Sequence, residues 1–273
     1  MKLFKHARAI IKIGFLFAYV YLFAPVRNGW RKLTGTCHTT VLLYHRVSDE
    51  SLDSITVKKT QFHRQLTLLR RHYAVLTMEE FLNSRGRPRR RPSVIVTFDD
   101  GYQDNYHAAM LMREANIPGT FFICTGIVGT SGCFPKDTRM GRRLPTLSWE
   151  QIQEMADWGF DIANHSVTHI EMGSASPEVC LAEIQKASQD LSEKLGEKNR
   201  QEWFAYPFGR SHNITKEVLN QLDTVGVKYC FSAYGGVNRT HFDPHNILRQ
   251  GVDHTFSSLA FLAIVEGYRV RSY

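Results

Sequence analysis

Apolar runs rich in β-branched and aromatic residues alternate with stretches of helical periodicity along most of this chain. The runs are bounded by turn-forming residues, which is typical of strands, whereas apolar positions three and four residues apart predict helices. The predicted strands cover residues 39–47, 94–98, 119–124, 160–164, 203–206, 229–233 and 247–252. The predicted helices cover residues 61–73, 104–115, 148–158, 177–195, 215–225 and 256–267, and a short helix begins at Thr77.

This alternation predicts an α/β fold in which each strand runs parallel to the one before it. Folds of this kind carry their sites at the carboxyl ends of the strands, so a barrel-like domain is expected over residues 37–273. Residues 125–147 contain four glycines and show no periodic pattern. A loop of that length in a compact domain is usually functional or mobile, and we interpret it as a rim of a substrate groove.

The first 36 residues have a different pattern, in which an apolar stretch over residues 13–26 lies between two basic clusters. The clusters are Lys2, Lys5, Arg8 and Lys12 before it, and Arg27, Arg31 and Lys32 after it. The stretch lies at or below the roughly 17–25 residues that span a bilayer, and no signal-peptide cleavage site is evident.

Three interpretations of this segment remain: an uncleaved signal anchor, a helix lying in the membrane interface, or a packed N-terminal helix of the soluble domain. The first two predict association with the membrane, and we expect the cell inner membrane with the domain that follows outside the cytoplasm. Positive charge on both flanks leaves the orientation open.

Net charge and cysteine content say less about the function than the sequence patterns do. A net charge of +8 suits an anionic membrane or an acidic polymer, and no basic patch with interleaved aromatics points to a nucleic-acid partner. Five cysteines, none in a Cys-x-x-Cys pair, argue against a disulfide framework.

The most informative residues follow the strand predicted at 94–98, where Asp99 and Asp100 are adjacent and precede a glycine. Neighbouring carboxylates at the end of a buried strand repel each other and lose solvation, so a cation is expected beside them. His165 and His169 follow the strand predicted at 160–164. One carboxylate and two imidazoles form a three-ligand site for a divalent metal, with a position left for water. The second carboxylate then remains available as a base.

Four motifs make the chain resemble the polysaccharide deacetylases, the carbohydrate esterases of family 4 with a nodulation-type deacetylase domain, and their exopolysaccharide-deacetylase branch in particular. The resemblance covers residues 39–265, and its motifs are Thr-Phe-Asp-Asp-Gly-Tyr at 97–102, His-Ser-Val-Thr-His at 165–169, Ala-Tyr-Pro-Phe-Gly at 205–209 and Leu-Leu-Tyr-His-Arg-Val at 42–47. It implies a distorted (β/α)7 barrel that removes N-acetyl groups from amino sugars of a bacterial surface or extracellular polysaccharide. The alternatives are a metal hydrolase of the same barrel acting on a non-sugar amide or an O-acetyl ester, and a catalytically weak carbohydrate-binding protein.

The resemblance also implies roles for individual residues. Asp100, His165 and His169 are expected to hold the metal, with Zn²⁺ first and Co²⁺ or Ni²⁺ as alternatives, and Asp99 is expected to take the proton from water. If residues 165–169 open a helical turn, their spacing puts both imidazoles on one face. The substrate-binding candidates are Tyr206, Pro207 and Phe208, and the N–H after Pro207 is a candidate donor to the oxyanion.

Two positions depart from the family pattern. Ala205 stands where members commonly carry an arginine that holds the base. Arg249 is the candidate replacement for that arginine. The alternative is that Arg249 only forms a surface or structural ion pair. The late Leu-x-His motif, whose histidine protonates the leaving amine, is absent. His45 is the candidate for that role, and the alternative is that His45 is only a structural histidine. His254 is a weaker candidate. Asp104 is expected to cap the helix that follows the first motif.

Overall fold

The computed structural model describes residues 11–50 and 53–268, and its centre is a nearly closed barrel of seven parallel strands. Around the barrel the strands are β10 (Arg249–Gly251), β1 (Thr39–Tyr44), β5 (Ser93–Phe98), β6 (Thr120–Ile123), β7 (Asp161–Asn164), β8 (Asn199–Ala205) and β9 (Tyr229–Phe231). A bridge between Phe231 and Ile247 brings the two ends of this sheet together, and the Ser232 N–H donates to the Ile247 carbonyl at 2.9 Å. The predicted distorted (β/α)7 barrel is confirmed.

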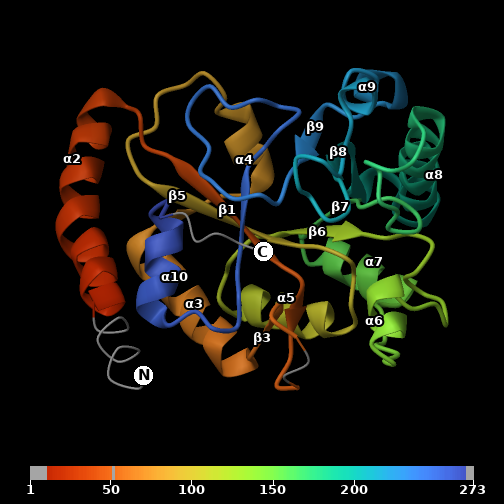
Figure 1. Cartoon of the computed structure of the whole chain (residues 1–273), viewed down its shortest axis with the longest axis horizontal. Coiled ribbons are helices and arrows are strands. Elements are labelled where there is room, and N and C mark those ends of the chain that lie inside the picture. The colour runs from red at the N-terminus through yellow and green to blue at the C-terminus, as the bar shows by residue number, and fades with distance from the viewer. Residues whose placement is uncertain (1–10, 51–52, 269–273) are drawn as a thin grey trace.

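Helices surround the barrel, as Figure 1 shows. They are α3 (Lys59–His72), α4 (Met78–Asn83), α5 (Asp104–Glu114), α7 (Trp149–Asp157), α8 (Pro177–Leu195), α9 (Lys216–Leu219) and α10 (Ser258–Val265). Three short strands lie outside the ring: β4 (Ala74–Val75) pairs with β5, and β2 (Arg46–Val47) pairs with β3 (Thr56–Val57). Capping boxes begin α4 at Thr77 and α7 at Ser148, where each hydroxyl accepts from the third helical N–H.

The strands are buried because both faces of the sheet are covered. Every residue of β1 and β5 is buried, and their register pairs Thr39 with Ser93 through to Tyr44 with Phe98. The rings of Tyr44 and Phe98 stack with centroids 5.3 Å apart. Since β1 and β5 end side by side, His45 and Asp99 leave the barrel at the same edge.

Two details differ from the sequence predictions. Asp104 is the first residue of α5 rather than its cap, because its carboxylate accepts from the Arg46 guanidinium at 2.9 Å and from the Val47 N–H at 3.2 Å. The helix predicted at 215–225 is divided into α9 and a 3₁₀ turn, η3 (Leu222–Val225). There the Thr224 hydroxyl donates to a carbonyl three residues earlier, a local bond that competes with helix continuation.

The N-terminal segment is helical over residues 11–34 and packs against α10 at the left of Figure 1. It contains a π-helical turn, η1 (Tyr19–Phe23), followed by α2 (Ala24–Thr34). The buried Glu266 carboxylate accepts from Arg27 at 2.6 Å, from Asn28 at 2.8 Å and from the Tyr73 hydroxyl at 2.9 Å. These bonds attach the helix to the barrel domain.

No helix among the described residues combines the length and apolarity needed to cross a bilayer. The outward face of helix 11–34 is nevertheless apolar and exposed, and its large side chains are Ile11, Ile13, Phe15, Phe17, Tyr21, Leu22, Phe23, Val26, Trp30 and Leu33. Three members of the first basic cluster, Lys2, Lys5 and Arg8, lie outside the described residues, whereas Lys12 lies within them.

Candidate metal centre

The adjacent carboxylates leave β5 on a turn that requires unusual backbone angles. Asp100 has φ of 79° and Gly101 has φ of 92°, both in the left-handed region. A side chain at Gly101 would also meet Val128 at 2.8 Å, so glycine is needed there for two reasons. An aspartate at positive φ is uncommon and often marks a functional site. Here both Asp99 and Asp100 are buried at the barrel edge.

The segment with the two histidines is a turn and not a helix, so the predicted helical turn is wrong. Ser166 and His169 have φ of 66° and 60°. The carboxylate of Glu183, on α8, accepts from the N–H groups of Val167 at 3.0 Å and Thr168 at 2.9 Å. These bonds satisfy the backbone donors outside a helix, and they still let both imidazoles converge.

The histidines and Asp100 form the group of donor atoms expected for a metal. The Asp100 Oδ1 atom lies 3.5 Å from His165 Nε2 and 3.3 Å from His169 Nε2, and the three donor atoms all lie within 4.8 Å of one another. The second nitrogen of His165, Nδ1, is 2.6 Å from the Ala205 carbonyl, which leaves Nε2 for a ligand.

The donor set has the features that a divalent cation requires. The Asp100 Oδ1 atom is buried and has no hydrogen-bond partner among the described residues, which is unusual for a buried charge. Tetrahedral ligands at about 2.0–2.2 Å from Zn²⁺ lie roughly 3.3–3.6 Å apart, close to the two distances found here. Burial alone would raise the pKa of Asp100, but the Lys136 ammonium and the imidazoles hold that pKa well below its usual range. The residues fit a divalent metal.

Asp99 is held by Arg249, the candidate replacement for the family arginine. Its Oδ1 accepts from Arg249 Nη1 at 2.6 Å and its Oδ2 from Nη2 at 2.7 Å. The guanidinium is fully buried and is oriented by a third bond from Nε to the Ser232 carbonyl at 2.9 Å. Burial would raise the pKa of Asp99, but Arg249 and His165 lower it below its ordinary value. The carboxylate therefore stays ionised, with Oδ2 3.8 Å from His165 Nε2.

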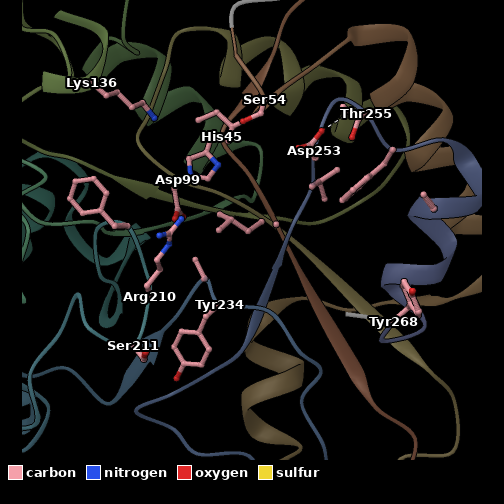
Figure 2. Close-up of a pocket in the computed structure, with 18 of the residues that line it drawn as sticks. His45, Ser54, Asp99, Lys136, Arg210, Ser211, Tyr234, Asp253, Thr255 and Tyr268 are labelled. Carbon is pink, nitrogen blue, oxygen red and sulfur yellow. Dashed lines mark hydrogen bonds between the residues drawn. The ribbon is translucent and has the colours of Figure 1, made fainter. Parts of the chain in front are cut away.

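A cavity of about 880 Å³ opens over these residues, and Figure 2 shows Asp99, His45 and Lys136 on one side of it. His45 lines it, and burial lowers the pKa of this imidazole to about 4. Phe208 also lines it, 48% exposed, with its ring 4.8 Å from that of His169. Tyr206 and Pro207 are buried and are not among the described residues that line the cavity.

Sequence reasoning missed Lys136, whose Nζ lies 3.0 Å from Asp100 Oδ2. The lysine belongs to α6 (Pro135–Arg139), inside the long loop that was interpreted as a rim. The neighbouring Asp137 accepts from the Tyr102 hydroxyl at 2.7 Å, which fixes α6 to the motif that carries Asp100. The only signal in the sequence was the length of the loop. His254, the weaker acid candidate, is exposed and is not among the described lining residues.

Comparisons with known proteins identify relatives by sequence and by fold. The sequence model of the polysaccharide deacetylase family matches residues 86–229, slightly more than half of the chain. The presumed polysaccharide deacetylase YxkH of Bacillus subtilis (strain 168) is 24% identical over 247 residues, 89% of this chain and 81% of that protein. The chitooligosaccharide deacetylase of Sinorhizobium fredii is 27% identical over 166 residues, 59% of this chain and 63% of that one. Among solved structures, IcaB of Ammonifex degensii is 27% identical with a TM-score of 0.72, covering 84% of this chain and 97% of that one.

Proposed function

The chain belongs to the polysaccharide deacetylase family, and from that premise we propose that it removes N-acetyl groups from amino sugars of a bacterial surface or extracellular polysaccharide. One observation carries the proposal: a buried carboxylate oxygen with no hydrogen-bond partner in the described part of the chain lies beside two imidazoles, and a second carboxylate next to it is held by an arginine. That arrangement suits metal-assisted hydrolysis of an acyl group, and the amino-sugar substrate is what the family implies.

Asp100, His165 and His169 would hold the divalent cation, which we propose to be Zn²⁺, with Co²⁺ or Ni²⁺ as substitutes. When bound, such a cation lowers the pKa of water and polarises a carbonyl. The short bond from His165 Nδ1 to the Ala205 carbonyl orients the imidazole, and Glu183 holds the turn between the two histidines.

Asp99 is proposed to accept the proton of the attacking water. Its two bonds from Arg249 keep it ionised and aim it into the cavity, and each oxygen retains a lone pair for the proton. Arg249 is therefore proposed to position Asp99, a role that Ala205 cannot perform at the position of the family arginine.

His45 is proposed to deliver a proton to the leaving amine. Because burial holds its pKa at about 4, the imidazole is neutral at pH 7, and any proton that it delivers must first be taken up during the reaction. The negative charge that develops at the reacting carbonyl favours this uptake. The Phe208 N–H, the group after Pro207, stays the proposed donor to the oxyanion.

We further propose that helix 11–34 lies on the surface of a membrane. Its exposed apolar face includes Phe17, Phe23 and Trp30, and a helix with an apolar outer face and basic neighbours is typical of an interfacial segment. The fixed contacts of Glu266 with Arg27 and Asn28 would then hold the catalytic domain at the membrane surface.

The direct test is acetate release from N-acetylglucosamine oligomers by the purified full chain, first stripped with a chelator and then reloaded with Zn²⁺ or Co²⁺. We expect release to depend on the metal and to be lost in Asp99→Asn, while Asp157→Asn, at a carboxylate whose side chain is 51% exposed, retains it. Release only from O-acetylated sugars or cyclic amides would favour the other hydrolase alternative. Sugar binding without any release would favour the carbohydrate-binding alternative.

A further inference from the structure

The cavity over the metal centre extends away from it to the N-terminal helix. Besides the catalytic residues it is lined by Lys12, Ile13 and Leu16 of that helix and by a group near the end of the described chain. That group includes the apolar residues Val252, Phe256, Ala260 and Tyr268 and the polar residues Asp253, Thr255 and Ser257. Figure 2 shows Asp99 and His45 on one side of the pocket and Tyr268 on the other, beside α10.

The two parts of the cavity differ in chemistry. Near Asp99 it carries charged and hydrogen-bonding groups, including Lys136, Arg210 and Tyr234. Toward the helix the lining is mainly apolar, and the part formed by Ile13, Leu16, Val252, Phe256, Ala260 and Tyr268 is called the apolar arm below, although Lys12, Asp253, Thr255 and Ser257 also line this side of the cavity. Sugar hydroxyls would find few partners in such an arm, and unpaired polar groups there are unfavourable.

The apolar arm has a fixed wall. The Tyr268 ring packs against the rings of Phe15 and Tyr19, with centroids 5.7 and 5.3 Å apart. The Tyr19 hydroxyl donates to the Glu266 carbonyl at 3.0 Å, and Arg27 binds the Glu266 carboxylate. These contacts hold the helix on the side of the arm, where it forms one wall of the cavity.

The opposite face of the same helix exposes a large apolar surface, with Phe17 and Phe23 each more than half exposed. Contiguous exposed apolar surfaces often mark sites of membrane or protein interaction. Ile13 belongs to both surfaces, because it is 60% exposed and also lines the arm. A hydrocarbon chain could therefore pass from a membrane at the outer face into the arm without crossing water.

We propose that the substrate is an N-acetylated amino sugar attached to a membrane lipid, with the sugar over Asp99 and the hydrocarbon chain in the apolar arm. This inference rests on the proposed deacetylase function and adds the chemical class of the group that carries the sugar. The volume of about 880 Å³ is within the roughly 300–1,000 Å³ of ligand pockets, which is adequate for a sugar with a short length of chain.

The test compares methyl and octyl β-glycosides of N-acetylglucosamine, used below the micelle concentration of the octyl compound. Isothermal titration on the chelator-treated full chain measures binding without turnover. Each methylene that enters an apolar site strengthens binding by up to about fourfold, and ordering of the chain offsets part of this gain. We expect the octyl compound to bind about 10- to 100-fold more tightly than the methyl compound.

Matched variants separate the arm from the outer face of the helix. Ile13→Asp and Ala260→Phe, which make the arm polar or fill it, are expected to remove most of the octyl preference. Phe17→Asp, at a 53% exposed position on the same helix that does not line the cavity, is expected to retain it. Thermal unfolding of each variant identifies any that is misfolded, and Ile13→Asp is at an exposed position, so it should fold.

Equal binding of the two glycosides by the unmodified chain would overturn the lipid-linked substrate. So would a preference that survives Ile13→Asp and disappears in Phe17→Asp. Acetate release by the metal-loaded enzyme is followed in parallel. Release from both glycosides without an octyl preference leaves the deacetylase function intact and refutes the apolar arm. An octyl preference without any acetate release supports the arm and refutes the deacetylase function.

Discussion

Replacing Arg249 by methionine would leave the Asp99 carboxylate buried without its partner. The guanidinium is fully buried and makes two bonds to the carboxylate, at 2.6 and 2.7 Å. Removing one member of a buried ion pair destabilises a protein by about 3–5 kcal/mol, because the remaining charge has lost its compensation. We expect a loss of that size in the free energy of unfolding of the metal-free protein at pH 8.

The loss should depend on pH, with a sign that follows from the pKa of Asp99. In the unmodified protein this pKa is below the unfolded value of about 3.9, so the stabilisation is complete above that pH and is lost only as pH falls through the folded pKa. In Arg249→Met the guanidinium no longer offsets the effect of burial, so the pKa of Asp99 rises above the unfolded value. The folded variant then loses stability as pH rises through the raised pKa, so the deficit should be smaller at pH 5 than at pH 8.

Urea unfolding in the presence of a chelator, at pH 5, 6, 7 and 8, measures the deficit. Arg249→Lys keeps the charge without the bidentate geometry and should give an intermediate deficit. The control is Arg200→Met, because the Arg200 side chain is 39% exposed and its pair with Asp161 is worth at most about 1 kcal/mol. A deficit under about 1 kcal/mol for Arg249→Met, or one equal at pH 5 and pH 8, would refute the assignment of Arg249 as the group that keeps Asp99 ionised.

Three further results are expected. Glu183→Gln weakens the bonds to the histidine turn and should lower Zn²⁺ affinity about tenfold by competitive titration, whereas Glu193→Gln on the same helix should leave the affinity unchanged. Phe17→Asp combined with Phe23→Asp should abolish sedimentation with phosphatidylglycerol vesicles while metal-dependent acetate release from soluble oligomers is retained, and unchanged sedimentation would contradict the interfacial helix. His45→Gln should reduce acetate release about 10²- to 10⁴-fold with Zn²⁺ affinity unchanged, and a variant as active as the parent would assign the proton to another group.

The sequence located the proposed metal-binding residues because each motif follows a strand directly. Asp99 and Asp100 continue β5, and His165 continues β7. The carboxyl ends of parallel strands meet at one edge of a barrel, so residues remote in sequence could be placed together from the strand pattern alone. The same reasoning gave Arg249 only as a candidate, because this residue lies within a strand and not directly after one. It reaches Asp99 because β10 pairs with β1, which in turn pairs with β5.

Local patterns do not contain the geometry of the connecting segments. The spacing of four residues between His165 and His169 suggested a helical turn, which does not form. The actual conformation depends on Glu183, which lies on α8 and is remote in the sequence. Lys136 reaches Asp100 because Asp137 is bonded to Tyr102, an interaction between a loop and a motif 35 residues apart. Neither partner is indicated by periodicity, which reports only which face of an element is apolar.

The N-terminal segment shows a related difference between composition and contacts. A boundary at residue 36 follows from the change in composition, yet Tyr19 and Arg27 bind Glu266, more than 200 residues later in the chain. Ile13 and Leu16 line the same cavity as Asp99. Periodicity in residues 13–26 could indicate only an apolar helix, because both its packed face and its exposed face are apolar. The first face builds a wall of the cavity and the second is available to a membrane, so one helix would set both where the enzyme is located and which substrate can reach the metal.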